Sequence, residues 1–351
     1  MSKLKGYFVF KDMFFLYNPK RFANISQWDF IILLLSQPNK HLLFSDFQIK
    51  VTMPTFFEAI MTHSLLFSAL LAGFAASIVS GIIGSYVIVK RIVFIAGSIS
   101  HSVLSGIGLC IWLERTQGIH WASPLLGALT AAILSALILG WIHLYYRQRE
   151  DSVIAAIWSI GMAIGILFIS QTPGFNVELT NFLIGNILWV SQTDLYILWG
   201  LDICTILLVL CLHKRFLAIC FDEEQARLQG LPVNGLYLLL LILIAISIVL
   251  LIQVVGIVLV MTMLTIPATI ANLLTSSLSK MMLLAIFFSS LFCLTGNSVA
   301  YYFDWPTGAT IALIAGIAYI FSLTFFQLRK HLHLPLLRAK KKDFEHKVQS
   351  P

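Results

Sequence analysis

Long apolar runs, each separated from the next by a short polar break, recur along most of the chain. Nine of these runs are close to the roughly 20 residues that an α-helix needs to cross about 30 Å of hydrocarbon. A membrane β-barrel is excluded, because its strands would alternate apolar and polar positions. We therefore predict an all-α, polytopic bundle of about 8–9 membrane-spanning helices. The predicted crossings are 59–88, 92–113, 121–146, 152–171, 193–213, 233–252, 254–275, 280–300 and 306–328.

The composition also indicates a membrane protein. Of the 351 residues, 59% are hydrophobic and only 11% are charged, whereas a soluble domain carries about 25% charged residues to cover its surface. This excludes a soluble enzyme, a disordered protein and a nucleic-acid-binding domain. The net charge of +7 is concentrated at the two ends, with +4 in residues 1–52 and +5 in residues 329–351, against −2 between them.

The basic residues between the two ends predict the orientation. Suppose that the first crossing starts outside and that the short apolar run 177–190 is a re-entrant or packed segment. Eight of the nine basic residues then fall on one side and only Arg115 falls on the other. Because cytoplasmic loops carry the excess of Lys and Arg, that side should face the cytoplasm, together with the tail 329–351, which would contact anionic lipid. The eight are Lys90, Arg91, Arg147, Arg149, Lys214, Arg215, Arg227 and Lys280.

The first 52 residues do not fit this pattern, because they would place seven basic residues outside, ahead of the first crossing. Their apolar run, Phe30–Leu35, is too short for a crossing or for the core of a signal peptide. They are either a disordered extension or a mis-annotated start with Met53 as the true first residue, and we favour the later start. The predicted organisation is an extension at 1–52, a transmembrane domain at 53–328 and a basic cytoplasmic tail at 329–351.

One polar loop, between the fifth and sixth crossings, has the signals of a short helix. Asp222 stands at the N-cap position, Glu223 lies in the first turn, Ala226 favours a helix, and Gly230 followed by Pro232 ends it. We predict an amphipathic helix on the cytoplasmic face. It is either an ordinary capped loop helix or a docking site for a cytoplasmic partner.

Several catalytic motifs are missing from the sequence. There is no GxxxxGK[ST], so the chain cannot hold and hydrolyse a nucleotide by the P-loop route, and any ATP must be used by another polypeptide. There is also no HExxH and no GxSxG in the setting of a nucleophile elbow. The five cysteines lack a CxxC pair and suit small apolar positions. No permanently bound cofactor is expected.

Ionisable groups inside a bilayer are costly, so each is a functional candidate. His101 lies ten residues after Arg91, about 15 Å along a helix from the cytoplasmic boundary. It is a candidate ligand or gate for a cation, or a structural histidine bonded to a neighbouring helix. Asp202, midway through the fifth crossing, is a candidate second ligand, a proton carrier or an acid facing a water pocket. Pro267 should kink or break its helix, and broken helices often line transport paths.

A series of short motifs carries a family resemblance. In chain order they are Lys90-Arg91 with Phe94–His101, Arg149–Asp151, Phe182–Leu188, Asp222…Ala226…Gly230–Pro232, Val255-Gly256…Ile266–Ala268 and Ser298…Tyr301–Gly308. With these motifs in this order, the chain resembles the permeases of zinc- and manganese-type ABC importers. The resemblance runs from about residue 54 to residue 326, close to the whole chain without its leader.

The resemblance implies a permease subunit of a bacterial importer for a divalent transition metal, multi-pass in the cell (inner) membrane. Two copies, or this chain and a paralogue, would form the pathway and work by alternating access. A pair of cytoplasmic ATP-binding subunits would dock below, and an extracytoplasmic metal-binding protein would deliver the metal above. The loop helix with Asp222, Glu223, Ala226 and Gly230 would then be the segment that couples to the ATPase. The later start at Met53 also agrees with where members of this family usually begin.

The sequence departs from the family at one position. Many members carry an acid four residues before the motif histidine, on the same helix face, where the two could bind a cation together. Here that position is Gly97, so oxygen ligands must come from elsewhere or binding in the pore must be weak, which transport tolerates because the ion has to leave. Imidazole suits zinc and iron, whereas a carboxylate would suit manganese. We therefore favour zinc, followed by manganese or ferrous iron.

Two other function classes fit some of these residues. A proton-coupled metal carrier would use Asp202 and His101 and would need no ATPase. An intramembrane hydrolase would use His101 as a base beside a nearby serine, but no acid that would orient the histidine is identifiable in the sequence. The loop helix and the ordered motifs favour the ATP-driven importer over both.

Overall fold

The computed structural model describes residues 56–119, 121–146, 150–173 and 190–349, where the regular structure is α-helical. The chain divides into two units, Met1–Pro54, which lies outside the described residues, and Thr55–Pro351. Within the described ranges, nine helices are long and apolar enough to cross a membrane, which confirms the predicted all-α polytopic bundle. The helices are Phe56–Thr62 (α4), Ser64–Val89 (α5), Val93–Gln117 (α6), Pro124–Tyr145 (α7), Glu150–Ser170 (α8), Gln192–Phe221 (α10), Glu223–Leu228 (α11), Val233–Val255 (α12), Ile257–Leu274 (α13), Leu278–Phe303 (α14) and Thr307–Gln349 (α15).

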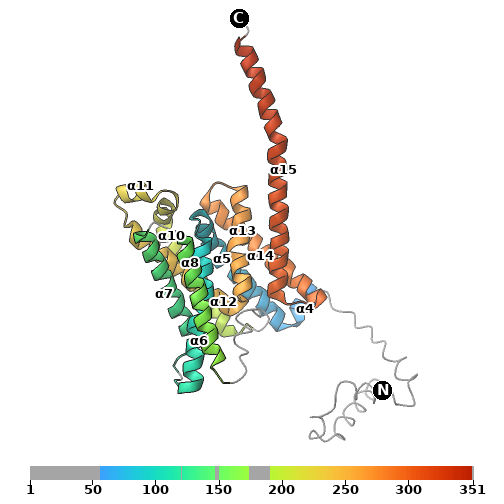
Figure 1. The fold of residues 1–351 in the computed structure, drawn as a ribbon. Coiled ribbons are helices and arrows are strands. Elements are labelled where there is room, and N and C mark those ends of the chain that lie inside the picture. Colours follow the sequence, from blue (N-terminus) through green and yellow to red (C-terminus); the bar gives the residue numbers. More distant parts are fainter. Residues whose placement is uncertain (1–55, 120, 147–149, 174–189, 350–351) are drawn as a thin grey trace, which may run out of the picture. The chain divides into compact units, whose positions relative to one another are not determined.

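Contacts between residues near the helix ends define two ends of the bundle. At one end, which carries α11 in Figure 1, Lys90 after α5 contacts the end of α10 and the start of α11. At the other end, Gln253 of α12 donates a hydrogen bond to Asp194 at the start of α10. Phe168, near the end of α8, packs its ring on Trp112, near the end of α6. We call these the α11 end and the opposite end.

The helices flanking the proposed re-entrant segment begin and end at the same end of the bundle. α8 runs toward the opposite end, and α10 starts from that end. The segment itself, 177–190, lies outside the described residues except for Val190, so its re-entrant character stays a prediction. Arg147 and Arg149 lie outside the described residues as well.

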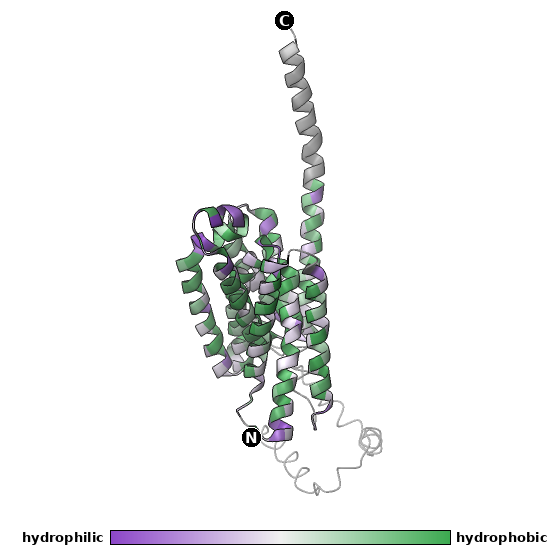
Figure 2. Cartoon of the chain, turned by 60° about the vertical axis from the view of Figure 1, so that its left-hand side comes forward, coloured by the Kyte–Doolittle hydropathy of each residue, from purple (hydrophilic) through white to green (hydrophobic). Residues whose placement is uncertain are grey.

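The hydropathy of the helices follows the layout expected for a bilayer. Figure 2 shows hydrophobic residues along the lengths of the helices and hydrophilic residues toward both ends of the bundle, including the α11 end. α12 lies at the centre, packed against α5, α6, α7, α10 and α13, and most of its residues are buried. The sequence of α12 is hydrophobic on all sides, which is typical of a helix surrounded by other helices.

Small residues set the closest helix crossings. A Cβ on Gly106 of α6 would collide with the carbonyl oxygen of Gly127 of α7, and a Cβ on Gly108 would meet the backbone of Gly165 of α8. A Cβ on Gly84 of α5 would collide with the carbonyl oxygen of Leu264 of α13. Such contacts are typical of membrane helices, which associate by close packing because the surrounding lipid is as apolar as their side chains.

Pro267 does not end its helix. Of the kink or break predicted at this proline, the break is wrong, because α13 continues as a helix through it, and the kink stays a prediction. The chain turns at Gly256, between α12 and α13 and close to the predicted boundary of these two crossings, with φ at +80°. Glycine adopts this conformation readily because it has no Cβ. A break that the sequence did not predict, at His63, divides the predicted first crossing into α4 and α5.

Candidate functional site

His101 lies in the middle of α6, where its half-buried imidazole stacks on the indole of Trp158 from α8. The ring centroids are 4.3 Å apart and the rings are inclined by only 10°. Within the described residues, neither ring nitrogen of His101 forms a hydrogen bond. The structural alternative from the sequence, a histidine bonded to a neighbouring helix carbonyl, therefore has no counterpart in this part of the chain.

The position one turn before His101 is closely surrounded. A Cβ built on Gly97 would lie 3.4 Å from Cε of Met261 in α13 and 3.7 Å from Cζ3 of Trp158. Met261 and Trp158 thus contact the same face of α6 as His101, since residues four apart in a helix share a face. The space that an acidic side chain would need here is bordered by a thioether and an indole.

The serines around His101 stabilise helix packing. The Ser98 hydroxyl donates to the carbonyl oxygen of Ile154 in α8 at 3.0 Å. The Ser102 hydroxyl donates a hydrogen bond to the Ser135 hydroxyl in α7 at 2.7 Å. Within the described residues, these serines bond to helix carbonyls and to Ser135, and none of them bonds to His101. The geometry therefore offers no support for a serine nucleophile activated by His101.

Asp202 is buried in α10, with only 1% of its surface exposed. Its carboxyl group lies beside the backbone at Val79 of α5. Within the described residues, neither carboxyl oxygen has a hydrogen-bond partner at normal distance and angle. His101 packs against α8, so the two predicted ligands face different helices. Across the described part of the chain, no three His, Cys, Asp or Glu side chains come close enough to hold a metal ion together.

α11 forms where the sequence predicted a short helix. The Asp222 side chain caps it by accepting a hydrogen bond from the Gln225 backbone amide at 2.9 Å. Ala226 is only 2% exposed, so this face of α11 packs against the protein itself, whereas Leu228 is 89% exposed. Gly230 ends the turn with φ at +79° and has open space around it. An apolar side chain is therefore presented to the surroundings at the end of a fixed helix.

Lys90 joins α11 to the turn between α5 and α6, a role that the sequence did not suggest. Its ammonium group donates to Glu223 at the start of α11 and to the carbonyl oxygen of Ile219, near the end of α10, at 2.7 Å. It also lies 5.8 Å from the ring centroid of Tyr237 in α12. The next residue, Arg91, has φ at +61°, an uncommon conformation for a residue with a side chain. The adjacent backbone strain is a signal that only the structure supplies.

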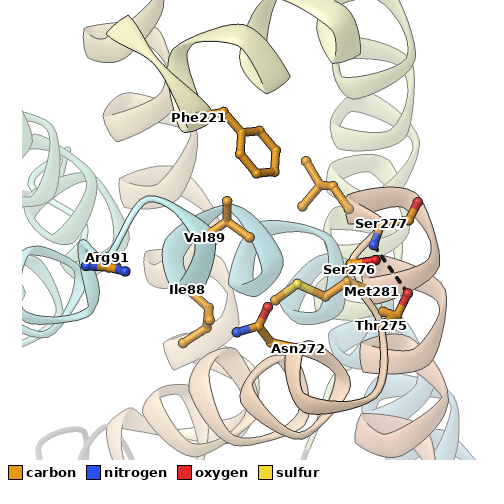
Figure 3. A pocket seen from close by; sticks show the side chains of 10 residues that line it. Ile88, Val89, Arg91, Phe221, Asn272, Thr275, Ser276, Ser277 and Met281 are labelled. Atoms are coloured by element: carbon orange, nitrogen blue, oxygen red, sulfur yellow. Dashed lines mark hydrogen bonds between the residues drawn. The ribbon is translucent and has the colours of Figure 1, made fainter. Parts of the chain in front are cut away.

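Two hollows flank Phe221 at the α11 end. One, of about 230 Å³, lies between α5, α13 and α14, and Figure 3 shows the side chains of Phe221, Asn272 and Met281 around it. The other, of about 260 Å³, lies along α10 and α11 and includes Asp222 and Ala226 in its lining. Phe221 lines both and is 67% exposed. The α11 end therefore combines surface hollows with exposed apolar side chains, as a docking surface does.

Comparisons with known proteins agree with these features. A family model described as the ABC 3 transport family matches residues 62–326. A probable metal transport system membrane protein of Chlamydia trachomatis is 48% identical over 259 residues, 74% of this chain and 88% of that protein. The manganese transport system membrane protein MntC of Halalkalibacterium halodurans is 33% identical over 271 residues, 77% and 90% of the two chains. The solved structure of PsaBC from Streptococcus pneumoniae in complex with Fab is similar, with a TM-score of 0.67 and 30% identity over 76% of this chain and 94% of that one.

Proposed function

Since the chain belongs to the ABC 3 transport family, we propose that it carries a divalent transition metal into the cytoplasm by alternating access. The chain is a multi-pass membrane permease subunit of a metal ABC importer. In the proposal, metal passes His101 and a second copy or a paralogue completes the pathway. An extracytoplasmic metal-binding protein delivers the metal at the opposite end, and a cytoplasmic pair of ATP-binding subunits docks at the α11 end.

The connection between the two sites is the observation that carries this proposal. Lys90 holds α11 through Glu223, and α6, the helix of His101, begins three residues after Lys90. A displacement of α11 by a docked subunit therefore acts directly on the start of α6. His101 lies eight residues into that helix, about 12 Å along its axis.

The orientation follows from the charges. Lys90, Arg91, Lys214, Arg227 and Lys280 belong to helix ends and turns at the α11 end. Since cytoplasmic segments of membrane proteins carry the excess of basic residues, this end faces the cytoplasm in our proposal. α15 also runs toward this end (Figure 1), so the proposal includes a cytoplasmic C-terminus in the inner membrane of a bacterial cell.

The side chains around His101 support zinc as the first cargo, ahead of manganese and ferrous iron. Imidazole binds zinc and iron well, whereas manganese prefers carboxylate and carbonyl oxygens. Gly97 supplies no carboxylate, and Met261 lies beside it. A single neutral imidazole holds the ion weakly, so the ion can leave toward the cytoplasm. The relative named for manganese transport makes manganese the main competitor.

The test is uptake of labelled zinc, manganese and ferrous iron into vesicles that contain the chain with its candidate ATPase and metal-binding protein. We expect one metal to be taken up faster than the others. Its uptake should require ATP on the side of the membrane where the ATPase is bound. Vesicles with an inactive ATPase are the matched control. Uptake that is independent of ATP but follows a proton gradient would contradict the proposal.

That second outcome has a structural basis in Asp202. A carboxyl group this deeply buried, without a hydrogen bond of good geometry in the described residues, could exchange protons along a carrier pathway. An Asp202→Asn variant separates the two functions. The ATP-driven importer should tolerate this nearly isosteric change, whereas a proton-coupled carrier should lose its uptake.

A further inference from the structure

Trp158 is the aromatic partner of His101, and its position is fixed from both sides. Its indole Nε1–H donates to the sulfur of Met162, one turn further along α8, at 3.2 Å. The α8 backbone is held close to α6 by Gly161, where a Cβ would lie only 2.7 Å from Cα of Ser102. The indole therefore cannot move away from α6 without disturbing the helix crossing.

The stacking geometry fixes the plane of the His101 ring, and this plane determines the direction from which a cation can bind. An imidazole binds a metal through a nitrogen lone pair that lies in the plane of the ring. An indole stacked at 4.3 Å and inclined by 10° covers one face of the His101 ring but neither nitrogen edge. The plane in which a metal must approach is thereby set, and both nitrogens stay available.

Metal-binding histidines are usually oriented in a different way. Their second nitrogen donates a hydrogen bond to a carboxylate, a carbonyl or a water, and this bond fixes both the ring and its tautomer. Within the described residues, no carboxylate or carbonyl group forms such a hydrogen bond with His101. The contact with Trp158 is then the interaction on this part of the chain that can orient the ring.

We propose that Trp158 is a positioning residue for metal transport, which holds the His101 ring edge-on to the passing cation. This inference rests on the proposed function of the chain as a metal permease. Because the stack constrains the ring plane but not the tautomer, either nitrogen can receive the ion and release it. This suits a site that an ion must cross, where a rigid hydrogen-bonded ligand would favour retention.

The test is a double-mutant cycle on the assembled importer in vesicles, with ATP-dependent metal uptake as the readout. Trp158→Leu removes the stack, and we expect it to lower uptake by about 3–10-fold, the range that corresponds to the energy of an aromatic pair. Trp158→Phe keeps an aromatic face and should restore most of that loss. In a His101→Ala background, Trp158→Leu should have no further effect, because the ring that it positions is gone.

Phe168→Leu is the matched control, since Phe168 of α8 makes an aromatic contact with Trp112 of α6 away from His101. It should leave uptake close to that of the wild type. In the purified permease, stacking on Trp158 should shift the His101 ring protons upfield in NMR spectra, and Trp158→Leu should abolish that shift.

Three results would overturn the role of Trp158. These are equal effects of Trp158→Leu with and without His101, failure of Trp158→Phe to restore uptake, and a loss as large in Phe168→Leu. Absence of ATP-driven metal uptake by the wild type is a separate result, which would overturn the proposed function and this role with it.

Discussion

At the scale of the residue, the proposed pathway passes a single imidazole. His101 stacks on Trp158 and follows Gly97 by one helical turn, and within the described residues no cluster of three metal-binding side chains accompanies it. Resident metal sites in proteins use several ligands with defined geometry. A single ligand binds an ion weakly, and an ion that crosses a membrane must be released again.

Gly97→Asp should change the preference for metal. Its Cβ fits at contact distance from Met261 and Trp158, and the added carboxylate would lie on the same face of α6 as His101. Because carboxylate oxygens suit manganese, we expect manganese uptake to rise relative to zinc by about 3-fold or more. Competition between the two labelled ions in vesicles measures the ratio.

Gly97→Ala is the control for this change, since it adds the Cβ without the charge. An equal shift in both variants would assign the effect to crowding against Met261. An unchanged ratio in Gly97→Asp would show that residue 97 does not contribute to the choice of metal.

At the scale of the element, the sequence predicted helices better than the contacts between them. The apolar runs predicted the nine crossings, because the thickness of the bilayer requires each spanning helix to be a continuous apolar stretch of a set length. The stack of Trp158 on His101 and the ion pair of Lys90 with Glu223 depend on how separate helices pack, so no local pattern contains them. Pro267 does not break α13, because a packed bundle tolerates a proline within a membrane helix.

α11 gives a sharper test of docking than its sequence suggested. Ala226 is buried against the protein, so a glutamate there would displace α11 besides disturbing a partner. Leu228 is exposed, and Leu228→Asp should weaken binding of the ATPase by about 10-fold or more if it is a central contact. Co-purification of the ATPase with the permease measures this. Leu228→Met should bind normally, and full binding by Leu228→Asp would contradict docking at this residue.

Loss of the Lys90 contact should uncouple the two sites without releasing the ATPase. Lys90→Met removes the ammonium that binds Glu223 and the Ile219 carbonyl. Hydrogen bonds to charged groups contribute about 1.5–3 kcal/mol, so we expect metal moved per ATP hydrolysed to fall at least about 3-fold. Lys280→Met, an exposed lysine at the same end, is the control. A normal ratio of metal to ATP in Lys90→Met would exclude a role in coupling.

At the scale of the whole molecule, the distribution of charge predicts which end faces the cytoplasm. Arg115 ends α6 at the opposite end, whereas the other described basic residues between 56 and 328 belong to the α11 end. Fluorescent protein fused after residue 351 should therefore fluoresce, and alkaline phosphatase fused there should be inactive. A fusion in the turn after Gly118 should give the reverse result. The same activity at both positions would contradict the orientation.

The Lys90 ammonium also has a consequence for engineered permeases. It is shared by α10, α11 and the ring of Tyr237 in α12, so one side chain forms a joint between segments far apart in the chain. If the loop with α11 were moved alone into a related permease, it would carry Glu223 but not Lys90. Such a chimaera should bind the donor's ATPase yet transmit its motion poorly, and the graft should succeed only when the lysine travels with the loop.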